Sequence, residues 1–329
     1  MKLVGIVASA ALALVLAGCP NEARNDSIRA ANEGNQALGM KQYDAAIPPL
    51  KRATERWAEN HTAWYSLGIA YKGKNDWTAA TEALSHAVQI RPEEAMYQLV
   101  YGWCLYEKAI ATARDELARR ENKKPADVTP DLSTVNFEKP LQHLQQAVKL
   151  NTDLWRAHYV IGRIFRDTGK PKEAAEELTK ALKSAPTDPA PWVALAELYR
   201  LWDYTEQAIQ IAEAGTTAVP GLMDQSDIWY EVGMGYDDKR LDEKAIEAFT
   251  KAIEAKRDNH KARFQRGQAY FRKGDYGNAK RDLLDFSKAA GASVEFAKQQ
   301  ASKMLIEIAA KSAGPSSPAE DTAHPGKAK

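Results

Sequence analysis

Small residues recur at a fixed interval along the chain, with large apolar residues at helical distances around each of them. The interval is 34 residues, and it links the following pairs: Gly34 and Gly68, Gly68 and Gly102, Gly162 and Ala196, Gly233 and Gly267. Self-similarity at one period indicates an array of units, each of which buries its apolar face only by stacking on its neighbours. The pattern predicts an array of about seven units over residues 27–292.

The period and the residue types within it resemble the tetratricopeptide repeat (TPR). The most complete unit matches the signature of that family through these residues: Trp64, Leu67, Gly68, Tyr71, Ala80, Leu84, Ala87 and Pro92. The resemblance implies an all-α fold, a right-handed TPR solenoid in which each unit is a pair of antiparallel helices. First helices would line an inner groove. Small residues would let the paired helices approach closely, so a bulky residue at Gly68 or Ala80 would overpack the seam.

Two departures from the period concern single turns or helices. Pro48 and Pro49 lie early in the second helix of the first unit, and proline donates no backbone hydrogen bond, so we expect that helix to be kinked or to start late. Residues 223–225 add three positions between Ala196 and Gly233, which predicts a longer turn and a local change in stacking.

The third unit is interrupted by an insertion at about residues 108–135. Its first helix contains Gly102, whereas the matching second helix, with Leu144 and Ala147, comes 26 residues later than the period requires. Apolar spacing continues the first helix to about Glu121 through the following residues: Leu105, Ala109, Ile110, Ala113 and Leu117. A loop then returns to a helix capped near Asn136. The projection is basic, and two interpretations stay open: a solvated extension, or a contact element for a partner or an anionic lipid.

The N-terminal segment predicts export and a lipid anchor. Lys2 precedes an apolar stretch over residues 3–17, which is the length of a signal peptide and too short for a spanning helix. Residues 16–19, Leu-Ala-Gly-Cys, resemble the lipobox of bacterial lipoproteins. That resemblance implies a signal peptide at 1–18 and a mature chain that starts at Cys19, bearing a diacylglycerol thioether and an N-acyl chain such as palmitate. The alternative is an ordinary secreted protein cut near Ala17.

The remaining boundaries follow from composition. Residues 19–26 are polar and predict a tether behind the lipidated cysteine. Because Pro20, not aspartate, follows Cys19, the sorting rule of the family implies the periplasmic face of the outer membrane. Residues 293–312 carry apolar residues at helical spacing, which predicts a capping helix. Residues 313–329, rich in Pro, Ser and Ala, predict disorder.

Charge and motifs exclude several classes of function. Lys and Arg number 45 and Asp and Glu 44, so the chain lacks the positive excess that favours nucleic acid. Two cysteines are too few for a cysteine-built metal site, and Cys104 falls in an apolar helix, where burial is favoured over reactivity. No phosphate-binding, dinucleotide-binding or catalytic motif occurs. We therefore expect no cofactor, no metal and no enzymatic activity.

Function is then expected from the inner groove. The first-helix positions through which the family contacts partners fall here on these residues: Tyr65, Trp103, Tyr106, Arg156, Tyr159, Arg163, Arg166, Tyr230 and Phe264. Aromatic residues and arginine are enriched at binding hot spots, and Arg163 and Arg166 are expected to pair with a carboxylate on a bound segment. In the alternative interpretation, the aromatic residues only pack between adjacent repeats.

The resemblance implies a lipid-anchored, non-enzymatic adaptor of a Gram-negative envelope, which binds a segment of another envelope protein. Lipoproteins of this kind resemble the pilotins of type IV pilus secretins and the assembly factors of outer-membrane barrels or peptidoglycan synthases. The alternative from another class is a groove that binds glycan or peptidoglycan fragments, with Trp103 and Tyr106 stacking on sugar rings. No carboxylate pair is placed for glycoside cleavage.

Overall fold

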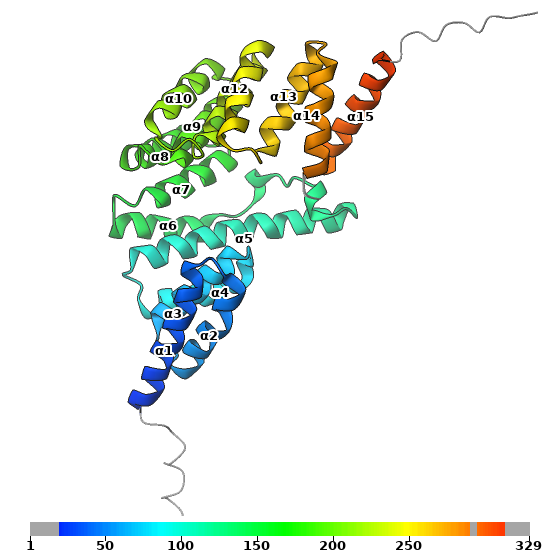
Figure 1. Cartoon of the computed structure of the whole chain (residues 1–329). Coiled ribbons are helices and arrows are strands. Elements are labelled where there is room, and N and C mark those ends of the chain that lie inside the picture. The colour runs from blue at the N-terminus through cyan, green and yellow to red at the C-terminus, as the bar shows by residue number, and fades with distance from the viewer. Residues whose placement is uncertain (1–19, 290–294, 313–329) are drawn as a thin grey trace, which may run out of the picture. The chain divides into compact units, whose positions relative to one another are not determined.

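The computed structural model describes residues 20–289 and 295–312, and every regular element in these ranges is helical (Figure 1). The chain divides into two compact units. The first unit comprises, among the described residues, 20–121 and 129–185, with α1 (Pro20–Gly39), α2 (Tyr43–Arg56), α3 (His61–Gly73), α4 (Trp77–Ile90), α5 (Ala95–Glu121), the short 3-10 helix η2 (Leu132–Thr134), α6 (Glu138–Leu150), α7 (Trp155–Asp167) and α8 (Pro171–Ser184).

The second unit comprises residues 122–128 and the described residues from 186 onward. It contains η1 (Pro125–Asp127), α9 (Pro189–Leu201), α10 (Thr205–Ala218), α11 (Ser226–Asp238), α12 (Asp242–Ala255), α13 (His260–Arg272), α14 (Tyr276–Ala289) and α15 (Glu295–Ser312). Helices α1 to α14 form seven consecutive pairs, and the two members of each pair pack together. The all-α array of helix pairs that the sequence predicts is confirmed.

The small residues of the 34-residue interval lie where the two helices of a pair come closest. A Cβ atom on Gly68 in α3 would lie 2.4 Å from Cγ of Leu84 in α4, which is closer than two carbon atoms pack. The same arrangement recurs in other pairs: Gly34 with Leu50, Gly102 with Leu144, Gly162 with Leu178, Gly233 with Phe249, and Gly267 with Leu283. The predicted role of these glycines in the seam is therefore confirmed.

A second recurring feature is a side-chain hydrogen bond that closes the turn before five of the seven pairs. The residue four places before the small residue, here called the anchor position, reaches the backbone carbonyl six residues earlier. Trp64 Nε1 donates to the Ala58 carbonyl oxygen at 2.8 Å, and Trp192 Nε1 donates to that of Pro186 at 2.8 Å. Other anchor positions do the same: Gln98 to Pro92, Arg263 to Arg257, and the His158 ring to Thr152. At these five anchor positions, the side chain supplies an N–H group that satisfies a carbonyl oxygen of the preceding turn.

The three extra residues at 223–225 change the donor of this hydrogen bond in the sixth pair. They lengthen the turn before α11, and Gln225 Nε2 donates to the Val219 carbonyl oxygen at 2.6 Å. That bond again spans six residues, but the donor lies before α11 and not at the anchor position, which is Trp229. The longer turn predicted from the sequence is present, and Gln225 is what closes it.

The first pair corrects the prediction of an N-terminal tether. Residues 20–26, predicted as a polar tether, form the first turns of α1. Ser27 is fully buried and donates to the Ala53 carbonyl oxygen at 2.7 Å, while the Arg24 guanidinium lies 4.9 Å from the centre of the Trp57 ring. The buried face of this helix is formed by small residues, Ser27, Ala30, Ala31 and Gly34, so the segment carries no pattern of large apolar residues that would predict a helix. Cys19 and the predicted signal peptide lie outside the described residues.

Helix α2 does not start late. It begins at Tyr43 and continues through Pro48 and Pro49, although neither can donate to the preceding turn. Pro49 and Leu50 are buried against the seam of the first pair. Tertiary burial therefore compensates for the missing hydrogen bonds of this helix.

The insertion divides between the two units. Helix α5 runs without interruption to Glu121, and residues 122–128 belong to the second unit, where η1 contacts α15. Residues 129–137 return to α6 in the first unit. There the Asn136 side chain accepts the backbone N–H of Glu138 at 2.8 Å.

Helix α15 covers the apolar side of the last pair. Ala301 and Ile308 are buried with Phe264, Leu283 and Phe286 of α13 and α14. Residues 293 and 294 of the predicted capping helix, and the predicted disordered tail at 313–329, lie outside the described residues.

Candidate functional site

The predicted groove residues of the first unit lie on α3, α5 and α7, and their aromatic rings belong to or pack against one core cluster. The Tyr65 ring stacks on that of Tyr97, with centroids 4.6 Å apart and planes inclined by 23°. Trp103 packs against Lys72, whose Nζ lies 4.3 Å from the ring centre. Five residues form what we call the inner aromatic row: Tyr65, Tyr97, Trp103, Tyr106 and Tyr159. Tyr65, Trp103 and Tyr159 are only partly buried, so part of the row faces solvent.

Two of the predicted contact residues are not available to a partner. Tyr106 is fully buried, with its ring 5.3 Å from that of Phe137. Phe264, on α13 of the second unit, is 7% exposed and packs 4.8 Å from Phe286. The repeat register places both residues on first helices, but it does not predict which face of a first helix its neighbour buries. These two predictions are corrected: both rings belong to the core.

The arginines of α7 already have acidic partners within the unit. Arg163 Nη1 donates to Glu107 Oε1 at 3.1 Å, and its guanidinium lies 5.0 Å from the centre of the Tyr106 ring. Arg166 pairs with Asp167 at 2.8 Å, and the same carboxylate accepts the Tyr106 hydroxyl at 2.5 Å. The expectation that Arg163 and Arg166 wait for a carboxylate on a partner is therefore corrected, because internal carboxylates neutralise both.

The side chains of this network keep their protonation states at ordinary pH. Burial lowers the pKa of Arg163, but Tyr106, Tyr159 and Glu107 raise it by more, so its pKa lies above the ordinary value and the group stays charged. Burial raises the pKa of Tyr106 far above its usual range. Glu107 also accepts the Trp103 indole N–H at 3.2 Å, so one carboxylate orients a ring and a guanidinium together.

Arg156 differs from the other two arginines. It lies at the start of α7 and is exposed, with its guanidinium 4.2 Å from the centre of the Trp155 ring. Trp155 in turn lies edge-on to Tyr159 at 6.2 Å. The inner aromatic row thus continues to the first turn of α7.

The inner side of the second unit carries charges that sequence analysis missed. Glu231 on α11 is 8% exposed and lies 3.5 Å from Arg200 Nε of α9, while Arg200 also pairs with Asp238 at 3.3 Å. Burial raises the pKa of Glu231 to about 7, since one shared arginine and the nearby Glu197 leave its charge poorly compensated. Tyr230, the predicted contact residue next to it, is partly buried beneath Lys261 at 5.2 Å. Only its burial distinguishes Glu231 from the many surface carboxylates of the chain, and the sequence pattern does not predict that burial.

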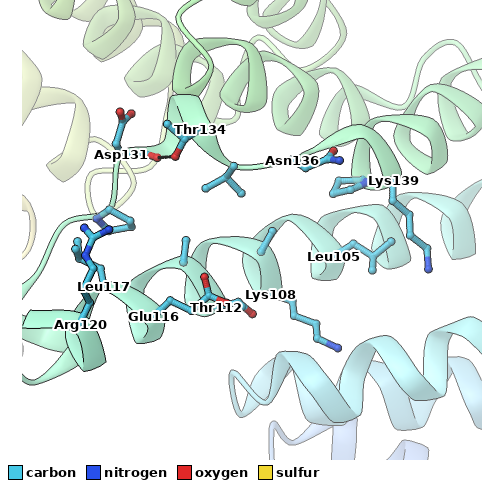
Figure 2. A pocket seen from close by; sticks show the side chains of 15 residues that line it. Leu105, Lys108, Thr112, Glu116, Leu117, Arg120, Asp131, Thr134, Asn136 and Lys139 are labelled. Carbon is cyan, nitrogen blue, oxygen red and sulfur yellow. Dashed lines mark hydrogen bonds between the residues drawn. The ribbon is translucent and has the colours of Figure 1, made fainter.

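The first unit contains a cleft of about 950 Å³ between α5 and residues 130–140 (Figure 2). Its floor is an apolar stripe of α5, formed by Leu105, Ala109, Ala113 and Leu117. The opposite wall carries Pro130, Val135 and Pro140. The sequence predicted the stripe, but it could not predict the wall, because residues 130–136 contain no regular pattern. We call this opening the insertion cleft.

Catalytic chemistry finds no support among these side chains. Burial raises the pKa of the Cys104 thiol to about 12, so this cysteine stays protonated and unreactive. Within residues 20–289 and 295–312, no three His, Cys, Asp or Glu side chains gather as metal ligands would. In the same ranges, no helix has the length and apolar character that crossing a bilayer requires.

Comparison with known families and structures agrees with this architecture. Models of the tetratricopeptide repeat match residues 32–95, 155–198, 226–259 and 243–292, which together span more than half of the chain. Anaphase-promoting complex subunit 3 of Schizosaccharomyces pombe is 26% identical over 161 residues, 45% of this chain and 24% of that protein. The chain therefore spans about a quarter of that relative.

Three solved structures share the fold at low identity. A tetratricopeptide-repeat protein of Parabacteroides merdae matches with a TM-score of 0.60 and 12% identity, over 87% of this chain and 99% of that one. PilW, a widely conserved type IV pilus biogenesis factor, matches with a TM-score of 0.53 and 17% identity, over 69% and 92%. PilF of Pseudomonas aeruginosa matches with 0.50 and 18%, over 72% and 93%. The six seams closed by glycine and these family matches show that the chain belongs to the tetratricopeptide-repeat proteins.

Proposed function

We propose that this chain is a lipid-anchored adaptor on the periplasmic face of a bacterial outer membrane. In this proposal the inner aromatic row binds a segment of another envelope protein and so assists assembly of an envelope machine. The chain attaches to the bilayer through Cys19 and acts without catalysis. The partly exposed rings of Tyr65, Trp103 and Tyr159, which all pack against one buried core cluster, are the observation that carries it.

The row supports binding because its rings are held in place before any partner arrives. Lys72 lies over Trp103, and Glu107 fixes the indole N–H. Little side-chain entropy then remains to be lost on association, which is the main advantage of preorganised sites. Aromatic side chains fixed in this way are typical binding hot spots.

The charges of the row indicate what kind of segment fits. Because Arg163 and Arg166 are neutralised internally, the row offers rings and hydrogen-bonding edges more than free charge. An apolar or aromatic segment therefore fits it better than an acidic one. PilW, a type IV pilus biogenesis factor with the same fold, supports a pilus-type apparatus as the machine served, although the likeness itself concerns the fold.

Partner capture tests the role of the row. The full chain carrying Trp103→Ala is compared with Trp202→Ala, a matched tryptophan that is 42% exposed at the end of α9 in the second unit. Both are purified from cross-linked envelopes, and co-purifying proteins are identified by mass spectrometry. We expect one protein to be lost with Trp103→Ala and kept with Trp202→Ala. An identical set with both variants contradicts the proposal, and circular dichroism checks that both variants fold.

Acyl labelling tests the anchor separately. We expect metabolic labelling with a fatty-acid probe to mark the natural chain and to disappear in Cys19→Ser. Membrane fractionation should show the variant released to the soluble periplasmic fraction. Labelling that persists in Cys19→Ser rejects the anchor and leaves the partner-binding role to be judged by the capture experiment.

A further inference from the structure

We propose that the insertion cleft is a second binding site, which takes an extended acidic peptide segment whose apolar side chains lie along the floor of α5. This surface is distinct from the inner aromatic row. It extends the adaptor function proposed above to a second peptide, but its test in solution does not depend on the lipid anchor or on the partner of the row.

The dimensions of the floor fit an extended peptide. Leu105 and Leu117 mark its ends and lie twelve positions apart on one helix, which places them about 18 Å apart. An extended chain covers that length with about five or six residues. Alternate side chains of such a peptide point the same way, so about three of them would contact the stripe.

The floor is apolar and still accessible. Leu105, Ala109, Ala113 and Leu117 are all only partly buried, and they face Val135 across the cleft. Their spacing places one apolar side chain at each turn of α5, without a polar interruption along the floor. Contiguous apolar surface of this kind, rimmed by charged residues, marks interaction sites in soluble proteins.

The charges at the rim select an acidic occupant. Three cations line the cleft: Lys108 and Lys139 near Leu105, and Arg120 beside Leu117 at the other end (Figure 2). The Lys108 amine turns toward α4 and donates to Thr81 Oγ1 at 3.4 Å, and the Lys139 Nζ lies 5.8 Å from the centre of the Tyr101 ring. In the part of the chain that the structure describes, no carboxylate lies within ion-pair distance of any of the three. This contrasts with Arg163 and Arg166 of α7, whose charges have internal partners.

The two acidic residues at the rim, Asp131 and Glu116, offset part of this positive charge. The Asp131 carboxylate accepts the backbone N–H of Ser133 at 3.0 Å and its hydroxyl at 2.6 Å, so it closes the turn of η2. Those hydrogen bonds hold its pKa below the ordinary value. Asp131 and Glu116 together carry two negative charges against three cations, so the lining keeps an excess of one positive charge. A peptide with a carboxylate near each end would place one beside Lys139 and the other beside Arg120. Leucine-like side chains between the two carboxylates would contact the floor.

Two synthetic peptides test the site with the full-length chain. One is a fluorescent decapeptide of alternating leucine and glutamate, and the other alternates leucine and lysine. Binding is measured by fluorescence anisotropy. We expect the glutamate peptide to bind and the lysine peptide to bind about tenfold more weakly or not at all, because the rim cations repel it.

Variants then locate the binding. Ala113→Trp fills the floor, and the double variant Arg120→Glu with Lys139→Glu reverses the rim. Each should weaken the glutamate peptide about tenfold or more, the size of an interface contact replaced by a clash or by like charge. Lys149→Glu is the matched control, since Lys149 is exposed on α6 and outside the cleft. It should leave binding within about twofold, because a distant surface charge is screened.

Three results would overturn the proposal: no binding of the glutamate peptide, equal binding of the lysine peptide, or binding that Ala113→Trp leaves unchanged. A fourth is displacement of the peptide by dodecanoate at lower concentrations than by unlabelled peptide, which would make the cleft a site for anionic amphiphiles. Trp103→Ala should leave peptide binding intact, so failure of the inner aromatic row and failure of the insertion cleft are distinguished. Thermal unfolding of each variant shows that the helices remain folded.

Discussion

Two junctions far apart in the sequence, α1 with α3 and α11 with α13, contain the same buried hydrogen-bond network. In the first, Asn60 Nδ2 donates to Ser27 Oγ at 2.8 Å, and Ser27 donates to the Ala53 carbonyl oxygen. In the second, Asn259 Nδ2 donates to Ser226 Oγ at 2.9 Å, and Ser226 donates to Ala252. Each asparagine also caps the next helix, by accepting the N–H of Ala63 or Ala262.

The junctions differ in what surrounds this network. His61 follows Asn60, and its Nδ1 lies 2.8 Å from the Tyr97 hydroxyl of α5. His260 follows Asn259, and within the described residues its buried Nδ1 has no hydrogen-bond partner. Likewise Asn32 of α1 is exposed, whereas Glu231, at the same place on α11, is buried against α9. The same serine and asparagine pair therefore forms the same junction twice. The neighbouring helices determine the burial and the hydrogen bonding of the residues that flank it.

Removing either asparagine should break its junction and produce the largest loss. Asn60→Ala and Asn259→Ala each remove a helix cap and leave a buried serine without its donor, so we expect each to lower the free energy of unfolding by about 2–3 kcal/mol. Urea unfolding measures the loss, and hydrogen exchange should place it in α1–α3 or α11–α13, respectively. Ser226→Ala, which keeps the cap, should cost less than Asn259→Ala. A cost below about 0.5 kcal/mol at either asparagine would refute the shared role.

The buried carboxylate should give the second junction a pH dependence that the first lacks. The pKa of Glu231 in the folded chain, about 7, lies above its unfolded value near 4.5, so the folded state holds this proton more tightly. Its contribution to stability is complete below about pH 4.5 and is lost as the pH rises to about 7. Glu231→Gln should therefore raise the free energy of unfolding at pH 8 by about 1–2 kcal/mol and change it little at pH 4.5.

Asn32→Asp on α1 is the matched control for this measurement. Its exposed carboxylate should leave the pH profile of unfolding unchanged between pH 5 and 8, because a solvated aspartate keeps an ordinary pKa. A Glu231→Gln profile parallel to that of the natural chain would show that Glu231 does not titrate in this window.

The two histidines should respond in opposite directions. His61→Leu loses the contact with Tyr97 and should lower the free energy of unfolding by about 1 kcal/mol. His260→Leu removes a buried nitrogen that has no partner and should raise it by up to about 1 kcal/mol. Thermal and urea unfolding at pH 8 compare the two. A loss of similar size in both variants would mean that His260 is bonded after all.

The smallest difference should come from the anchor position. Trp64→Phe keeps an aromatic ring but removes the bond to Ala58, which should cost about 0.5–1 kcal/mol. Trp229→Phe should cost less, because Gln225 and not Trp229 closes the turn before α11. Equal costs in urea unfolding would show that the indole N–H of Trp64 contributes nothing beyond its ring.

Sequence analysis was accurate where a residue serves its own helix pair. The glycines at the 34-residue interval and the leucines they meet are local to one pair, so their register predicts the contact. It was wrong for Tyr106 and Phe264, because their burial also depends on helices outside their own pair. Asp167 of α7 accepts the Tyr106 hydroxyl, and Ala301 and Ile308 of α15 pack in one cluster with Phe264. Sequence analysis was also wrong for the arginines of α7, since Glu107, the partner of Arg163, lies on α5. The prediction of a tether was also wrong. Helix α1 buries only small side chains, so its sequence shows no pattern of large apolar residues that would have predicted a helix.

The sequence by itself determined the period, the all-α fold and the seams, because steric fit between two consecutive helices depends on side-chain size at fixed positions. It also determined the apolar stripe that continues α5. The tertiary structure alone decided which groove residues face solvent, which charges are already paired, and that residues 130–140 form a wall opposite that stripe. These outcomes depend on groups brought together from different helices, and electrostatic pairing and burial follow distance in space, which no spacing along the chain records.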